Sequence, residues 1–148
     1  MPIPGFPCSA AFGEFDRIMH EMDRLYHEAA LRCGLSDTAL LVLYGLCQLG
    51  EGCLQKDVAD RFYLPKQTVN AAVRKLEQEG AVELRPAGGR QLGLYLTEPG
   101  RRLVERTVLP LARTEAAAMN ALTEAEQQAL LQGLDRYVTL LRQAAQSL

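Results

Sequence analysis

The chain has 148 residues, of which 48% are hydrophobic and 23% are charged, and its formal net charge is −2 at pH 7. This length suits one domain with a real core, or a small domain with dimerising helices, and the composition excludes wholesale disorder. The slight negative charge excludes a protein that is basic over its whole surface. From Gln55 to Arg106, however, ten Lys or Arg stand against seven Asp or Glu, while the rest of the chain holds six against eleven. A nucleic-acid-facing centre near +3, carried on acidic flanks near −5, fits this distribution.

The sequence contains no apolar run near the ~18 residues of a membrane span, and its start, MPIPGFPCSAAF, has neither the basic residues nor the long apolar stretch of a secretory signal. We therefore expect a cytoplasmic protein that does not enter a membrane. Residues 1–12, with three Pro and one Gly, are expected to form a flexible arm. The four cysteines form no CxxC pair and lack zinc-site spacing, so we expect reduced thiols and neither a metal nor a cofactor.

A long amphipathic helix is predicted from about Gly13 to Gly34. Its apolar stripe contains Phe15, Ile18, Met19, Met22, Leu25, Tyr26 and Ala29. An apolar face of this length near a chain end needs a partner, and a second copy of the chain is a natural candidate.

The middle of the chain predicts two further helices before the most informative stretch. Ser36 is a good N-cap, and the sequence TALLVLYGLCQL after it is apolar on nearly all sides, as expected of a buried helix. Gly50–Gly52 should end that helix, and a short helix from Gln55 to Phe62 should follow. Tyr63 and Leu64 then turn the chain into the next helix.

The stretch from Leu64 to Gly80 reads as one short helix with two different faces. Pro65 suits its first turn, and Gly80 suits the position just past its end. The apolar stripe consists of Val69, Ala72, Val73 and Leu76. The opposite face carries Gln67, Asn70, Ala71, Arg74 and Gln78, with Lys66 and Thr68 at the leading edge.

This second face has amides and cations but no acid, whereas a merely solvated helix face usually mixes Glu with Lys. Side chains with amide or guanidinium forks can pair with adenine or guanine edges in the major groove. Two short helices joined by a brief turn also form a helix-turn-helix, in which the second helix reads DNA. The pattern therefore predicts a DNA-reading helix, although an ordinary surface helix shares many of these features.

A β-hairpin is predicted after this helix, with strands at Ala81–Arg85 and Leu92–Leu96 joined by turn residues. Its tip carries Arg90 behind the flexible pair Gly88 and Gly89. A hairpin directly after a recognition helix is the wing of a winged helix. An Arg at such a tip is suited to a narrow minor groove, while a solvated turn is the plainer alternative.

The last third of the sequence is helical. Thr97 should cap a helix with Pro99 in its first turn, and Pro110 should bend or interrupt that helix. Thr123 and Glu126 form a capping box that opens the final helix. Its apolar face contains Leu130, Leu131, Leu134, Tyr137, Val138 and Leu141. Together with the first helix, this face suggests a joint dimer interface.

Three stretches resemble the MarR (multiple antibiotic resistance regulator) family of bacterial transcription factors: QKDVADRF, KQTVNAAVRKLEQEGAVE and RQLGLYLTEPGRRL. The resemblance extends over Phe12 to Leu148. It implies a mainly α fold with a small β-hairpin wing, a winged helix-turn-helix domain at 35–97, and helical dimerisation regions at 13–34 and 98–148. It further implies a homodimer on a pseudo-palindromic operator in double-stranded DNA.

The resemblance also assigns the DNA-facing side chains. Carried over position by position, they are Lys66, Gln67, Thr68, Asn70 and Arg74 in the major groove and Arg90 at the wing tip. Three positions depart from the family pattern: Gly88 stands where an Asp usually precedes the wing Arg, Leu54 where a Ser or Thr usually caps, and Ala71 where a polar residue is common.

Members of the family often lose DNA affinity when a small, commonly aromatic, molecule binds between the dimer helices and the DNA-binding lobe. By this resemblance a pocket would be lined by Met19, Met22, Tyr26, Leu43, Tyr44 and Cys47, although Met and aromatic residues at helical spacing are more often plain core. A thiol sensor at Cys8, in the N-terminal arm, is a second option. A metal site at His20, Asp23 and His27 would be incomplete, and these side chains are usually a solvated face.

These observations predict a dimeric, sequence-specific DNA-binding transcriptional regulator, a repressor released by a small-molecule ligand. Two alternatives are a winged-helix adaptor that binds proteins without reading DNA and a thiol-based redox-sensing regulator. We expect no enzyme, because both His lie on one predicted helix and the sequence shows no nucleophile elbow, phosphate loop or paired carboxylates.

Overall fold

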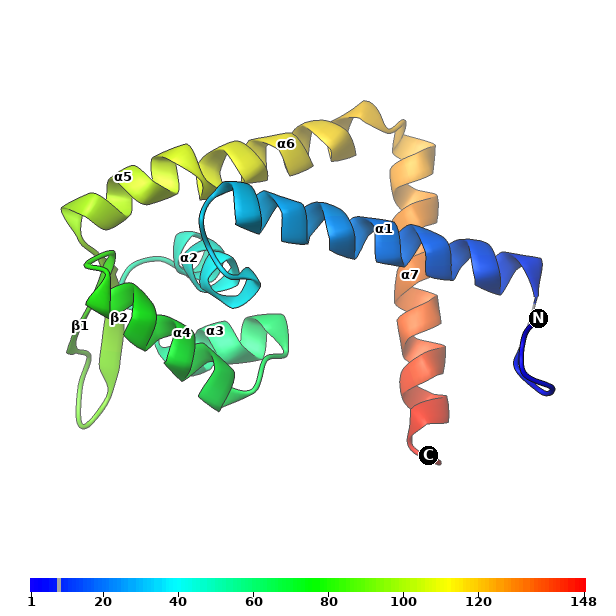
Figure 1. The fold of residues 1–148 in the computed structure, drawn as a ribbon, viewed down its shortest axis with the longest axis horizontal. Helices are drawn as coiled ribbons and strands as arrows, with labels where there is room; N and C mark the ends of the chain where they lie inside the picture. Colours follow the sequence, from blue (N-terminus) through cyan, green and yellow to red (C-terminus); the bar gives the residue numbers. More distant parts are fainter. Residues whose placement is uncertain (8) are drawn as a thin grey trace. The chain divides into compact units, whose positions relative to one another are not determined.

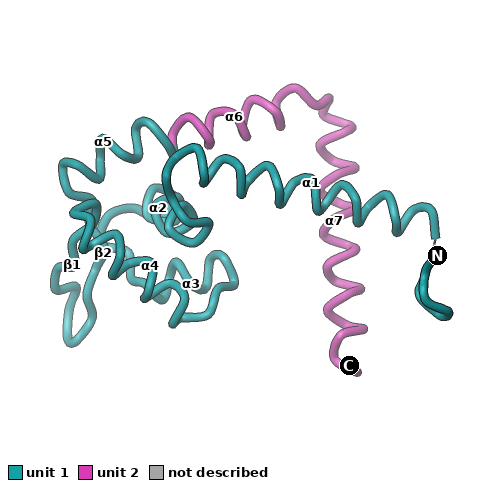
Figure 2. The backbone as a smooth tube through the Cα atoms, in the orientation of Figure 1, with its two compact units in different colours: residues 1–108 teal, residues 109–148 magenta. Residues whose placement is uncertain are grey.

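The computed structural model describes residues 1–7 and 9–148. The chain divides into two compact units, residues 1–108 and residues 109–148 (Figure 2). The described elements are helices and one two-stranded antiparallel hairpin, so the predicted mainly α fold with a β-hairpin wing is confirmed (Figure 1). Taken singly, none of the described helices is long and apolar enough to cross a membrane, and only the first two, bent by 88° at their junction, reach that length and composition as a pair.

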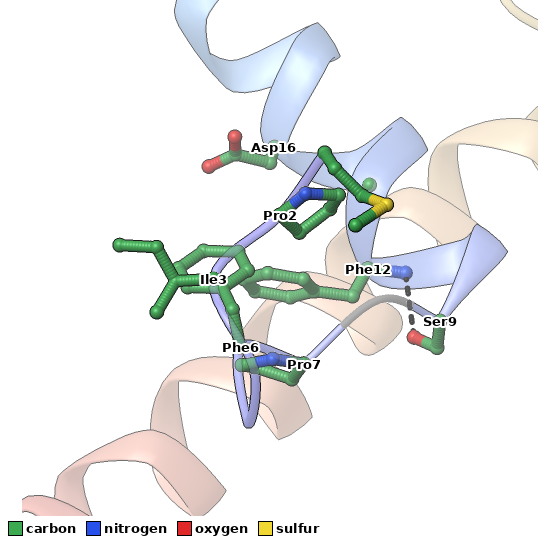
Figure 3. Close-up of a pocket in the computed structure, with 9 residues that line it drawn as sticks. Pro2, Ile3, Phe6, Pro7, Ser9, Phe12 and Asp16 are labelled. Carbon is green, nitrogen blue, oxygen red and sulfur yellow. Dashed lines mark hydrogen bonds between the residues drawn. The ribbon is translucent and has the colours of Figure 1, made fainter.

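Helix α1 spans Ala10–Arg32 and begins three residues before the predicted start at Gly13. The reason is local, because the Ser9 hydroxyl accepts a hydrogen bond of 3.2 Å from the Phe12 amide and so caps the helix. Residues Met1–Pro7 lie against the first turns of α1, where a hollow of about 550 Å³ opens between apolar side chains (Figure 3). Helix α1 includes residues 10–12, which the sequence predicts to be part of the arm.

Helix α2 spans Asp37–Leu49, and the Ser36 hydroxyl accepts from the Ala39 amide at 3.1 Å, as the predicted N-cap requires. The predicted burial of this helix is confirmed. Its buried residues are Ala39, Leu40, Val42, Leu43, Gly45 and Leu46. Because they lie on several sides of the helix, α2 forms the centre of the first unit.

Helices α3 (Gln55–Phe62) and α4 (Lys66–Gln78) follow, joined by one short turn (Figure 1). Pro65 is the N-cap of α4, so it stands one residue before the helix and not within its first turn. Leu54, the N-cap of α3, has no side-chain acceptor, so the capping is one-sided: the Leu54 amide donates to the Asp57 carboxylate at 2.9 Å. Both helices pack on α2. Their buried residues are Val58, Ala59, Val69, Val73 and Leu76.

Strands β1 (Val82–Pro86) and β2 (Leu92–Leu96) pair antiparallel, with Val82 opposite Leu96 and Pro86 opposite Leu92. The first strand begins one residue later than predicted. The stem of the hairpin lies in the core, because Val82, Leu94 and Leu96 are buried, while the tip is exposed.

Helices α5 (Glu98–Arg106) and α6 (Val108–Ala121) are separated at Thr107, where φ is −125° and ψ is −70°. Pro110 explains this break, since it lacks the amide that would bond to the Arg106 carbonyl and its ring crowds that turn. The predicted interruption is therefore confirmed, and it falls on the N-terminal side of the proline.

Helix α7 spans Glu124–Ala145. Its predicted capping box is confirmed, since the Thr123 hydroxyl accepts from the Glu126 amide at 3.2 Å and the Glu126 carboxylate accepts from the Thr123 amide at 2.7 Å. No residue of α7 is buried. Its exposed apolar side chains are Leu130, Leu131, Tyr137, Val138, Leu140 and Leu141.

Candidate nucleic-acid interface

The outer face of α4 presents the side chains that the sequence assigns to the major groove. Lys66, Gln67, Thr68 and Arg74 are exposed and Asn70 is half-buried. On the opposite side Val69, Val73 and Leu76 are almost completely buried, at 0%, 0% and 1% exposure. These three side chains fix the rotation of α4 on the core, so the polar face must point outward. The first turn of α4 contains no acidic residue.

The cations of this surface are not neutralised by neighbouring acids. Within residues 1–7 and 9–148, Lys66, Arg74 and Arg90 form no salt bridge, whereas the Arg85 Nε donates to the Glu83 carboxylate at 3.0 Å. A cation without a carboxylate partner remains available to replace the counterions of DNA phosphates. Arg85, in the stem of the wing, is already paired with the Glu83 carboxylate.

The tip of the wing holds Arg90 in a tight, exposed turn. Gly88 and Gly89 adopt φ values of +107° and +57°, which favour glycine because a side chain would strain the backbone there. The Ala87 amide donates to the Gln91 carbonyl at 2.9 Å, and the Gln91 amide donates to the Gly88 carbonyl at 3.1 Å. These bonds close the loop and leave the Arg90 side chain outside it.

The stem of the wing is attached to the helix-turn-helix by backbone pairing that the sequence did not reveal. The Gly52 amide donates to the Leu94 carbonyl and the Leu94 amide donates to the Cys53 carbonyl, both at 2.8 Å. Leu54 continues the pairing as an isolated antiparallel bridge with Gly93. Because this segment leads directly into α3, it fixes the wing relative to the two helices. So short a segment shows no strand pattern in a sequence.

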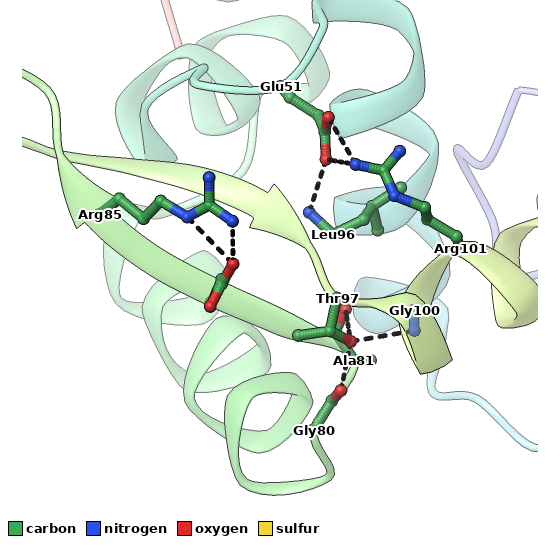
Figure 4. A network of polar contacts seen from close by, with 9 residues as sticks. Glu51, Gly80, Ala81, Arg85, Leu96, Thr97, Gly100 and Arg101 are labelled. Atoms are coloured by element: carbon green, nitrogen blue, oxygen red, sulfur yellow. Dashed lines mark hydrogen bonds and ion pairs between the residues drawn. The ribbon is translucent and has the colours of Figure 1, made fainter.

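Glu51 completes the attachment through its side chain (Figure 4). Its carboxylate accepts from Arg101 Nη2 at 2.9 Å on both oxygens and from the Leu96 amide at 3.0 Å. The Arg101 guanidinium, and next the Leu96 amide, hold the pKa of Glu51 below its ordinary value. Thr97, beside this group, accepts from the Gly100 amide at 3.0 Å and so caps α5. The network thus joins the end of α2, the end of β2 and the start of α5.

This network leads to a pH-dependent expectation. Because the folded pKa of Glu51 is depressed, its ionised carboxylate stabilises the fold above the unfolded pKa, and that stabilisation disappears as the pH falls through the folded value. Glu51→Gln is therefore expected to lower the urea midpoint at pH 7, and the gap to the wild type should narrow as the pH falls below the ordinary carboxyl pKa and close below the depressed, folded pKa. Urea unfolding followed by circular dichroism across this range measures the gap. Glu105→Gln, an exposed acid of α5 with no ion pair in the described chain, is the matched control and should show no such gap.

The predicted effector pocket draws its residues from two helices. Met19, Met22 and Tyr26 lie on α1, and Leu43, Tyr44 and Cys47 lie on α2. Leu43 has no exposed surface and belongs to the core, whereas Met22 and Tyr26 are 41% and 42% exposed. Tyr44 packs edge-on against Phe62, with ring centroids 6.4 Å apart. The hollow shown in Figure 3 lies elsewhere, at residues 1–16, so this pocket stays a prediction.

The described cysteines are free thiols. Burial raises the pKa of Cys47 and of Cys53, which favours the neutral thiol over the reactive thiolate. Cys8, predicted as a possible redox sensor, lies outside the described residues.

The histidines of α1 are paired with different acids. His20 Nε2 lies 3.4 Å from the Asp16 carboxylate, and His27 Nδ1 lies 2.8 Å from that of Asp37. Within the described chain no three His, Cys, Asp or Glu side chains form a group that could hold a metal ion, so His20, Asp23 and His27 are not brought together as ligands.

A family model described as "MarR family" matches residues 34–91, and no curated protein matches the sequence. NMB1585, a MarR family regulator from Neisseria meningitidis, has a TM-score of 0.78 at 18% identity, covering 94% of this chain and 99% of that one. The Staphylococcus aureus MepR–DNA complex has a TM-score of 0.69 at 22% identity, covering 91% and 99%. Staphylococcus aureus MarR in complex with salicylate and kanamycin has a TM-score of 0.67 at 16% identity, covering 89% and 90%.

At these identities the structural likeness concerns the fold, and the matched family model concerns the segment that contains α2, the helix-turn-helix and most of the wing. The matched segment contains α4, β1 and the tip of the hairpin with Arg90. Residues 34–91 therefore match the MarR family model, and the chain as a whole has the fold of the MarR family regulators.

Proposed function

We propose that the chain is a dimeric, sequence-specific DNA-binding transcriptional regulator. The observation that carries the proposal is the exposed face of α4, which holds amides and unpaired cations beside a wing tipped by Arg90. Such side chains are those that pair with base edges and phosphates. The fold supports the same conclusion, because MepR, which has this fold, is known in complex with DNA.

In this proposal the side chains of α4 divide by chemistry. Gln67, Asn70 and Arg74 have forked groups and contact base edges in the major groove, while Lys66 and Thr68, in the first turn, bind phosphates. Arg90 enters the adjacent minor groove, where the negative potential is strongest.

A salt titration tests DNA binding. Fluorescence anisotropy with DNA selected from a random pool should show that the logarithm of the association constant falls linearly with the logarithm of salt concentration, by about 0.9 per phosphate neutralised. Failure of the chain to select any sequence, together with the absence of salt-sensitive binding, would favour the adaptor alternative. The acidic net charge and Gly88 in the wing are the features that favour that alternative.

Dimerisation is proposed from apolar surface that folding of the single chain leaves exposed. On α1 the side chains of Ile18, Met22 and Leu25 are 49%, 41% and 59% exposed. Along α7 no residue is buried, although one side of the helix is apolar. Exposed apolar stripes of this size usually mark interfaces. The exposed apolar surfaces of α1 and of α7 therefore each support a homodimer, which we propose is formed by these N- and C-terminal helices.

Sedimentation velocity tests the dimer. The wild-type chain should sediment as a dimer at micromolar concentration, and Leu141→Glu should shift it toward monomer because a charge would enter the apolar face. Gln132→Glu, on the polar side of the same helix, should remain dimeric. A monomeric wild type would contradict the proposal.

We further propose that the regulator is a cytoplasmic repressor released by a small aromatic molecule. The support is the fold shared with Staphylococcus aureus MarR, which is known in complex with salicylate and kanamycin. Adding millimolar salicylate to the DNA complex tests release, which should appear as loss of anisotropy, and a complex unchanged by salicylate would count against this aromatic acid as an effector.

A further inference from the structure

The turn between α3 and α4 contains a strained residue. Tyr63 has φ +53° and ψ +40°, and it is the one residue other than glycine with positive φ in the described chain. The turn requires this conformation, because both the Tyr63 and the Leu64 amides donate to the Ala59 carbonyl at the end of α3. A left-handed backbone strains any residue with a Cβ, and glycine adopts it freely.

Within the described chain, the side chain of Tyr63 makes no polar or ring contact that would offset the backbone strain. It is 92% exposed, and no hydrogen bond, ion pair or ring contact of this side chain occurs in the described part of the chain. Its neighbour Phe62 behaves oppositely, since it is half-buried and packs edge-on against Tyr44. A large aromatic residue that is both strained and solvated points to a role outside the folded chain.

The position of Tyr63 indicates what that role is. It stands two residues before Pro65, at the entry to α4, and close to the exposed Lys66 in sequence. When a recognition helix enters the major groove by its N-terminal end, the preceding turn lies over the phosphate backbone at the edge of the groove. Tyrosine hydroxyls are among the side-chain groups that donate to phosphate oxygens there.

We propose that Tyr63 is a DNA-contacting residue whose ring lies along the sugar–phosphate backbone and whose hydroxyl donates to a phosphate oxygen. The inference rests on the proposed DNA-binding function. It explains why the turn carries a tyrosine where a glycine would be free of strain. A phosphate contact of this kind fixes the entry of α4 and carries no base preference.

Two substitutions test the proposal, with DNA selected by the wild-type chain as the probe. Tyr63→Gly should raise the thermal midpoint by roughly 1–4 °C, because the strain is relieved, yet weaken DNA binding roughly three- to tenfold. Tyr63→Phe keeps the ring and should leave the midpoint unchanged while losing part of the affinity. Since the hydroxyl is neutral, neither variant should change the salt slope or the selected sequence.

The outcomes separate this inference from the function on which it rests. If the wild-type chain selects no DNA, the proposed DNA-binding function and the proposed role of Tyr63 are both contradicted. Wild-type binding with an unaffected Tyr63→Gly variant overturns only the role of Tyr63. A changed selected sequence would assign Tyr63 to a base and overturn the phosphate contact, and a lowered thermal midpoint would show that the tyrosine serves the fold.

Discussion

Gly100→Ala is expected to lower the free energy of unfolding by about 3 kcal/mol or more. A Cβ at this position would lie 2.8 Å from the carbonyl carbon of Ala81 and closer still to its oxygen. That carbonyl cannot easily move, because it accepts from the Thr97 amide at 3.1 Å and Ala81 is only 5% exposed. The start of α5 would have to separate from Ala81, the residue that precedes β1. Urea unfolding followed by circular dichroism measures the loss.

The matched control is the same substitution in another helix. A methyl group added at Gly133 of α7 would meet nothing within 4 Å outside its own helix, so Gly133→Ala should raise helix stability by about 1 kcal/mol through the better helix propensity of alanine. Similar behaviour of the two variants would show that the close approach of α5 to Ala81 is not a constraint on the fold.

Arg74→Ala is expected to weaken binding to the selected DNA by about 1–3 kcal/mol at each half-site, which is roughly 5- to 150-fold per contact. A dimer places two copies of Arg74 on the operator, so the loss per complex should be roughly the square of that factor if the half-sites are independent. The base preference beneath Arg74 should relax at the same time. Anisotropy titrations and a repeated DNA selection measure both effects.

Two further variants show which contact Arg74 makes. Arg74→Lys keeps the charge but loses the guanidinium fork, so affinity for a guanine-containing site should fall while the salt slope stays unchanged. Arg106→Ala removes an exposed cation of α5 and should have little effect on base preference. Unchanged operator binding by Arg74→Ala would show that this face of α4 is not the reader.

Most of the secondary structure was predictable because its signals are local. Ser36, Thr97 and Thr123 each cap a helix with the hydrogen bond that their place in the sequence predicts. The break at Thr107 follows from Pro110 in the same way. Boundaries were less certain, as at α1, where Ser9 caps the helix three residues before its predicted start.

The reading surface was predictable for a related reason. Helical periodicity separates the buried Val69 and Val73 from the exposed Arg74, so the sequence alone defines which face of α4 meets solvent. The assignment of individual side chains to bases or phosphates is different, because it depends on the DNA and stays a prediction.

The helices, the hairpin and the acid-free face of α4 follow from the residues alone, because periodicity, caps and turn residues act within a few positions of one another. The attachment of the wing becomes visible in the folded chain, since Glu51 meets Arg101 across 50 positions and Ala81 meets Gly100 through backbone atoms that leave no pattern in the residue types. The strain at Tyr63 likewise arises from the fold, because the amides of Tyr63 and Leu64 both donate to one carbonyl at the end of α3. Contacts between distant segments depend on the path of the whole chain, and no local signal encodes them.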